Sequence, residues 1–200
     1  MPRLIGPALP VPQTRNPFVG KGLSVTVSLL LEPRPWRIRD LSTHSGASLT
    51  LTSMVVRQLI RGGLVDGGVE QGKPATVRGT RRLARETALH WPMPEVGVLG
   101  ALPTDGPIGG GPAHEAAGVT TDVPPRRYVR TVEQAQAALA LWGGALVSLD
   151  VADYELCIVD VALPEGLLPP TLVALELGGT PRGRETLEAH DDDLLGSLPP

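Results

Sequence analysis

The stretch that decides the fold runs from residue 39 to residue 65 and reads RDLSTHSGASLTLTSMVVRQLIRGGLV. Gly46 predicts a tight turn between two helices, because glycine adopts left-handed backbone conformations without strain. Ser48 is a good N-cap for a helix that begins at Leu49. The apolar face of this helix has regular helical spacing and consists of Thr52, Val55, Val56 and Leu59. We therefore expect a short helix, a glycine turn and a second helix with one buried face.

The residues on either side extend this pattern. Upstream, the apolar spacing predicts a helix over 20–31, and the following segment 36–38 is expected to be extended and to anchor Trp36 in the core. Downstream, Gly62 and Gly63 end the second helix. Two short strand-like runs, 64–66 and 75–78, then flank a glycine-rich tip that carries Lys73. A closing helix is expected over 80–91. Two strands around such a tip predict a wing, a β-hairpin that projects beside the helices.

Charge separates sharply between the two halves of the chain. The whole protein has 200 residues and a formal net charge of −3. Residues 1–90 contain 13 Lys and Arg against 5 Asp and Glu, whereas residues 91–200 contain 5 against 16. This asymmetry favours a basic module that faces a polyanion and an acidic C-terminal module for dimerisation, effector sensing or contact with a protein partner.

The glycine turn, the helix after Ser48 and the Gly63-Leu64-Val65 opening of the hairpin resemble winged helix-turn-helix regulators of the broad MarR type over residues 20–90. The resemblance implies that the helix after Ser48 enters the DNA major groove and that the wing contacts the backbone or minor groove. The residues expected to face DNA are Arg37, Arg39, Ser48, Leu49, Thr50, Ser53, Met54, Arg57, Lys73, Arg78, Arg81 and Arg82. Arg85 adds a further basic position. Alternatively, Leu49, Leu51 and Met54 could cover a neighbouring domain, and Arg81, Arg82 and Arg85 could be a solvated helix face.

The predicted fold class is α+β, with an N-terminal winged helix-turn-helix followed by a small acidic α+β domain. We expect a flexible tail over 1–17, the DNA-binding domain over 18–91, a Gly- and Pro-rich linker over 92–125, the acidic domain over 126–190 and a flexible tail over 191–200. Within the linker at most a short helix is expected near 113–117. The acidic domain is expected to contain helices over 131–142, 171–177 and 182–189, with β-rich runs over 145–151 and 155–163.

These features predict a sequence-specific transcriptional regulator that binds double-stranded DNA, most simply as a homodimer on a palindromic site. The layout is also similar to abortive-infection type IV antitoxins, with a looser match at residues 180–185. That similarity implies an autoregulator that also binds a toxin. Two other hypotheses remain: a scaffold whose helix-turn-helix binds a protein partner, and a nuclease or transferase in the acidic domain.

Other sequence features argue against an enzyme. His114-Glu115 and the run 190–193 lack the spacing of a metal site, and 109–111 lack the flanking residues of a phosphate-binding loop. Cys157 lies in an apolar run and is expected to be a buried thiol, which fits a reducing, cytoplasmic setting. No apolar stretch approaches the roughly 20 residues that cross a bilayer, and neither a membrane nor a cofactor is expected.

Overall fold

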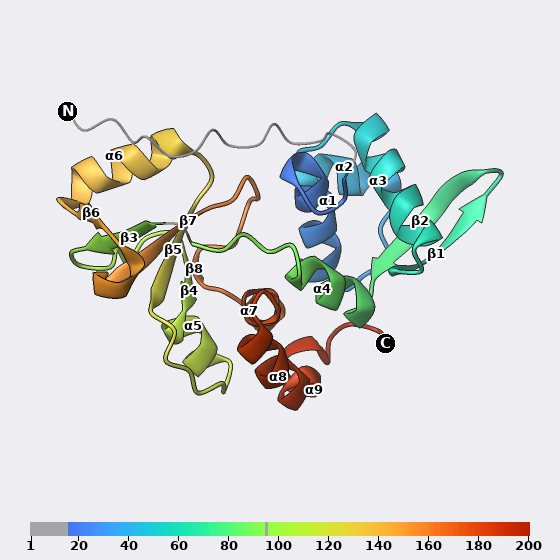
Figure 1. Ribbon diagram of the computed structural model, residues 1–200. Coiled ribbons are helices and arrows are strands. Elements are labelled where there is room, and N and C mark those ends of the chain that lie inside the picture. Colours follow the sequence, from blue (N-terminus) through green and yellow to red (C-terminus); the bar gives the residue numbers. More distant parts are fainter. Residues whose placement is uncertain (1–15, 95) are drawn as a thin grey trace.

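The structure is a computed structural model that describes residues 16–94 and 96–200 (Figure 1). The tail expected over 1–17 therefore lies almost wholly outside the described residues. The protein belongs to the α+β class, as the sequence predicts: it combines helices with a six-stranded mixed sheet and a separate two-stranded hairpin. Across 16–94 and 96–200, no helix is both long and apolar enough to span a membrane.

The N-terminal lobe, residues 16–91, contains three helices, a hairpin and a fourth helix. In chain order these are α1 (Gly20–Leu31), α2 (Ile38–Ser45), α3 (Leu49–Arg61), β1 (Val65–Glu70), β2 (Lys73–Gly79) and α4 (Arg81–Ala88). The hairpin projects away from the helices (Figure 1). Trp36 is buried and exchanges two backbone hydrogen bonds with Val77 of β2, at 2.8 and 3.0 Å, so it ties the segment between α1 and α2 to the hairpin.

Local sequence explains why α3 has these limits. Gly46 adopts a left-handed φ of 65° at the end of α2 and turns the chain. The Ser48 hydroxyl accepts a hydrogen bond from the Leu51 backbone N–H at 3.3 Å and caps the helix. The predicted apolar face is buried in full; it consists of Thr52, Val55, Val56 and Leu59. Burial of this face fixes which side of α3 points outward.

The hairpin is longer than the sequence suggested. β1 and β2 pair from Val65 with Gly79 to Glu70 with Lys73, and only Gln71 and Gly72 form the turn. Both turn residues have positive φ, 48° and 76°, as the tight turns of twisted hairpins require. The expected eight-residue tip over 67–74 is therefore wrong.

The C-terminal lobe is built on the six-stranded sheet, with strand order β6-β3-β7-β5-β4-β8. The pairs β5–β7 and β4–β8 are parallel and the others are antiparallel. The strands are β3 (Val96–Leu99), β4 (Pro107–Gly110), β5 (Pro125–Val129), β6 (Ala145–Val147), β7 (Tyr154–Ile158) and β8 (Gly166–Leu167). The helices are α5 (Gly111–Ala116), α6 (Val132–Trp142), the 3₁₀ turn η1 (Leu149–Val151), α7 (Pro170–Gly178), α8 (Pro181–Ala189) and α9 (Asp191–Leu195). The α6 helix lies over one face of the sheet and α5 over the other (Figure 1).

The prediction of a linker over 92–125 is wrong, because this segment contributes β3, β4 and α5 to the C-terminal lobe. Its glycines permit close packing. A Cβ at Gly109 would collide with the Glu176 carboxylate, and Gly110 has a φ of 64° where a Cβ would collide with the Pro124 carbonyl. The β-rich runs expected over 145–151 and 155–163 are also shorter, since η1 and a loop replace their ends.

The expected flexible tail over 191–200 is a second correction. It forms α9 and a final turn, and Leu194, Leu195 and Leu198 are buried in the core. The Arg81 backbone N–H donates to the Pro199 carbonyl at 2.8 Å, so the end of the chain caps the start of α4.

One large apolar cluster extends across both lobes, and a second, smaller cluster lies within the C-terminal lobe. The α7 helix is buried from Thr171 to Gly178 and packs against α1 and α4 of the N-terminal lobe, and against α8 and α9. At Gly178 a Cβ would collide with the Ala88 side chain, so α4 and α7 cross very closely. The two lobes therefore form one folded unit.

Candidate nucleic-acid interface

The outer face of α3 is open to solvent. Leu49 is 49% exposed, Thr50 and Arg57 are also exposed, and Ser53 and Met54 are half-buried. Ser48 is exposed as well, although its hydroxyl oxygen already caps the helix. Burial of the opposite face holds this surface rigidly outward. The helix therefore presents two hydroxyls, two apolar side chains and a guanidinium along one side.

The N-terminal lobe carries exposed cations on α3 and on neighbouring elements. They are Arg37 and Arg39 at the start of α2, Arg57 on α3, Lys73 at the end of the hairpin and Arg82 on α4. None of these five forms an ion pair with any other residue in 16–94 or 96–200. The Arg82 guanidinium reaches Gly63 at the end of α3, since a Cβ there would lie 3.3 Å from its Nη1.

Arg61 is a basic residue of this surface that our sequence analysis did not select. It lies in the last turn of α3, four residues after Arg57, and it is exposed and without an ion pair among the described residues. Residues four apart lie on the same side of a helix. That spacing was the signal that could have identified it.

Arg81 is engaged elsewhere. Its Nη1 lies 2.6 Å from Asp192 and 3.1 Å from Asp191, both in the first turn of α9. Arg85 pairs with Asp191 at 2.8 Å. The acidic end of the chain thus neutralises two of the three arginines of α4, and only Arg82 is left open at the edge of α3.

The predicted basic wing is electrically balanced, which is a correction. In the hairpin register Glu70 lies opposite Lys73 and Asp66 lies opposite Arg78. Arg78 is half-buried, and its Nε is buried with no hydrogen-bond partner among the described residues. The hairpin therefore adds shape to this surface but no net positive charge; the excess charge comes from α2, α3 and Arg82.

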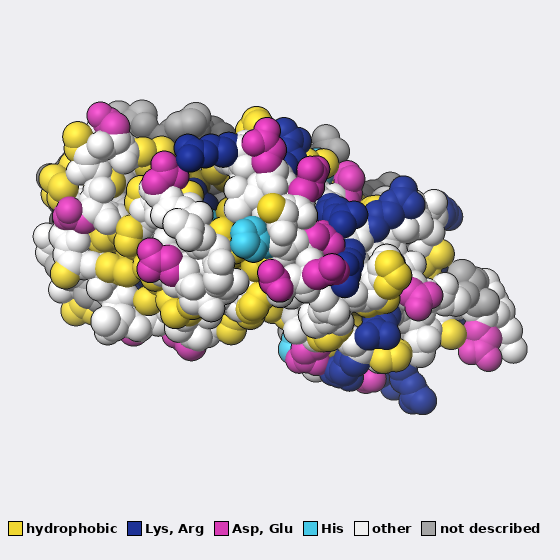
Figure 2. Space-filling view, turned by 90° about the horizontal axis from the view of Figure 1, so that it is seen from below, with side chains coloured by type: hydrophobic (Ala, Val, Ile, Leu, Met, Phe, Trp, Pro, Cys, Tyr) yellow, Lys and Arg dark blue, Asp and Glu magenta, His cyan; other side chains and the backbone are white. Residues whose placement is uncertain are grey.

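Figure 2 shows that basic side chains are unevenly distributed on one face of the molecule. Most Lys and Arg side chains gather over the half that holds the N-terminal lobe, whereas Asp and Glu side chains are scattered over both halves. No known protein family, curated protein or solved structure matches this chain.

The most elaborate polar cluster is buried in the C-terminal lobe around Glu176 of α7. Its carboxylate accepts hydrogen bonds from the Tyr128 hydroxyl at 2.5 Å and the Gly110 backbone N–H at 3.0 Å, and it bonds His114 Nε2 at 2.9 Å. Arg126 lies 3.6 Å away and also binds Glu155 at 2.7 Å. Burial alone would raise the pKa of Glu176, but His114, Arg126 and Tyr128 outweigh it and lower the pKa, so the carboxylate is ionised.

This cluster joins α5, β4, β5 and α7, and every oxygen of Glu176 is already engaged. We interpret it as a structural network of polar contacts that stabilises the C-terminal lobe. His114 bonds Glu176 and not its neighbour Glu115. Among the described residues, no group of three or more His, Cys, Asp or Glu side chains could hold a metal ion. Cys157 is buried, and burial raises the pKa of its thiol to about 12, so the thiol is protonated at neutral pH.

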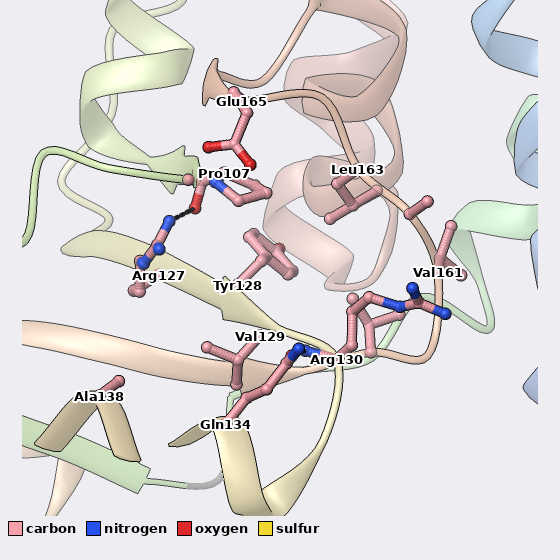
Figure 3. Close-up of a pocket in the computed structure, with 13 residues that line it drawn as sticks. Pro107, Arg127, Tyr128, Val129, Arg130, Gln134, Ala138, Val161, Leu163 and Glu165 are labelled. Carbon is pink, nitrogen blue, oxygen red and sulfur yellow. Dashed lines mark hydrogen bonds between the residues drawn. The ribbon is translucent and has the colours of Figure 1, made fainter. Parts of the chain in front are cut away.

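A cleft opens between β5, α6 and the segment that follows β7 (Figure 3). Its walls include Val129, Val161 and Leu163, and its two arginines bond to other parts of the fold. Arg127 donates to the Pro107 carbonyl at 3.2 Å, and Arg130 pairs with Asp160 at 3.1 Å. The sequence-predicted residues lie on the N-terminal lobe, and none of them lines this cleft.

Proposed function

We propose that this protein binds double-stranded DNA in a sequence-dependent manner and regulates transcription, with α3 as the recognition helix of a winged helix-turn-helix. The order α1-α2-α3-β1-β2-α4 supports this assignment, because a short helix, a tight turn, an outward helix and a projecting hairpin are the parts of that motif. The observation that carries the proposal is the open outer face of α3, with Arg57 and Arg61 exposed and unpaired among the described residues.

The composition of this face suggests how it would read DNA. Thr50 and Ser53 lie near the N-terminal end of α3, where hydroxyls can bond to base edges or phosphates, and Leu49 and Met54 can contact thymine methyl groups. Arg57 and Arg61 lie towards the C-terminal end, with Arg82 beside them. The N-terminal half of α3 would therefore read bases while the arginines hold phosphates.

Selection from a random pool of short DNA duplexes tests the proposal. The wild-type protein should enrich a defined motif, and Thr50→Ala with Ser53→Ala should bind that motif about 5- to 150-fold more weakly, the equivalent of one lost base contact of 1–3 kcal/mol. Thr43→Ala is a matched control, because Thr43 is exposed on α2 and its hydroxyl bonds the Arg39 carbonyl. Failure to enrich any motif, or a motif indifferent to the α3 changes, would contradict the assignment and favour protein docking instead.

A further inference from the structure

The two edges of the six-stranded sheet are protected very differently. β8 forms one edge, and it is preceded by Pro164 and Glu165 and followed by Pro169. Prolines and charged residues commonly prevent an edge strand from pairing with another chain. β6 forms the other edge and lies between Gly143-Gly144 and Ser148, with neither a proline nor a charge beside it.

The edge strand β6 lies within a stretch of sequence without charged residues. From Gln134 to Leu149 the chain has no Asp, Glu, Lys, Arg or His, although residues 91–200 as a whole are strongly acidic. Much of this stretch is exposed. Leu141 on α6 is 78% exposed and Leu146 at the centre of β6 is 39% exposed, while Ala137, Ala140 and Ala145 are exposed beside them. An exposed surface without charge, formed by α6 from Gln134 onward and by β6, is unusual on a monomer and marks an interaction surface.

We propose that this surface, formed by the outer side of α6 and the open edge of β6, binds the same surface of a second copy of the chain. An edge strand can pair antiparallel with itself about a two-fold axis, which gives a self-complementary contact and a closed dimer. With the axis at Leu146, Val147 would lie opposite the partner's Ala145. The strand ends at Val147, and Asp150 lies beyond it in η1, so pairing of residues 145–147 brings no carboxylate opposite another.

Charge selects this contact over others in the C-terminal lobe. Sixteen acidic residues against five basic ones make two copies of residues 91–200 repel each other over most of their surface. The charge-free strip is where they can approach without that penalty. The strip lies at the opposite end of the molecule from α3 (Figure 1), so the contact would leave both α3 faces uncovered.

Light scattering coupled to gel filtration, followed by sedimentation equilibrium of the full chain, tests this inference. The wild-type protein should be dimeric at micromolar concentrations, and Leu146→Lys or Leu141→Lys should raise the dimer dissociation constant by about tenfold or more, because a lysine would be desolvated at the contact. Leu167→Lys is the matched control: Leu167 is 48% exposed on the other edge strand, β8, and this variant should remain dimeric.

Hydrogen exchange provides a readout that does not depend on any variant. The backbone amides of β6 should become more protected as the wild-type concentration rises. A wild-type monomer throughout the micromolar range would overturn the proposal, and so would a dimer that persists in both the Leu141 and Leu146 variants. Neither outcome bears on DNA binding, which the duplex selection tests separately.

Discussion

Removal of both α3 arginines should change how DNA binding depends on salt. On α3 and the elements next to it in the N-terminal lobe, six cations are exposed and unpaired among the described residues: Arg37, Arg39, Arg57, Arg61, Lys73 and Arg82. If each neutralises one phosphate, log K should fall against log salt with a slope of about −5. Arg57→Ala with Arg61→Ala removes two contacts, so the slope should become shallower by about 2.

The same arithmetic gives a second signature. With a slope difference of about 1.8, the ratio of wild-type to variant affinity should shrink by about 12-fold between about 50 and 200 mM salt. Fluorescence anisotropy on a labelled duplex measures both slopes. Arg182→Ala with Arg184→Ala removes the same charge from exposed positions on α8 and should leave the slope unchanged. Equal slopes for the two double variants would refute α3 as the phosphate-binding helix.

Three further outcomes follow from packing and charge. Gly79→Ala should lower the free energy of unfolding by about 1–3 kcal/mol in a urea titration, because the new Cβ would collide with the Leu29 carbonyl, whereas Gly68→Ala has open space and should cost less than Gly79→Ala. Glu176→Gln should cost about 3 kcal/mol at pH 7. The pKa of Glu176 is lowered from 4.5, so the stabilising effect of its carboxylate is present at neutral pH and lost as pH falls through that lowered pKa. The wild type and Glu176→Gln should therefore converge in free energy of unfolding in acid. A difference in stability that stays constant with pH would contradict the argument. Asp191→Asn with Asp192→Asn should release Arg81 from its ion pairs and tighten binding to non-specific duplex DNA. The charge-matched control, Asp193→Asn with Glu188→Gln, should tighten this binding less. Equal effects of the two double variants would mean that the ion pairs do not restrain Arg81.

The N-terminal lobe was largely predictable because its signals are local. Gly46, the Ser48 cap and the apolar spacing from Thr52 to Leu59 lie within fourteen residues, and each acts on its immediate neighbours. The outward face of α3 follows from the buried one. Arg61 could have been selected by the same logic.

The C-terminal lobe was less predictable because its constraints are distant in the chain. Gly109 and Gly110 resemble a flexible hinge until the carboxylate of Glu176 and the carbonyl of Pro124 are found beside them. The acidic run at 191–193 resembles a solvated tail, but its partner Arg81 lies 110 residues earlier. Short strands such as β6 and β8 have too few residues to reveal a period of two.

The burial of α7 between the lobes has a practical consequence for anyone who works with pieces of this protein. A fragment that ends near residue 91 would expose the surface of α4 that α7 covers, including Ala88, and would also lose the Pro199 carbonyl that caps Arg81. The complementary fragment would uncover α7 along the side that meets α1 and α4. Neither half is an isolated building block, so DNA-binding and assembly experiments need the chain cloned through its last residues.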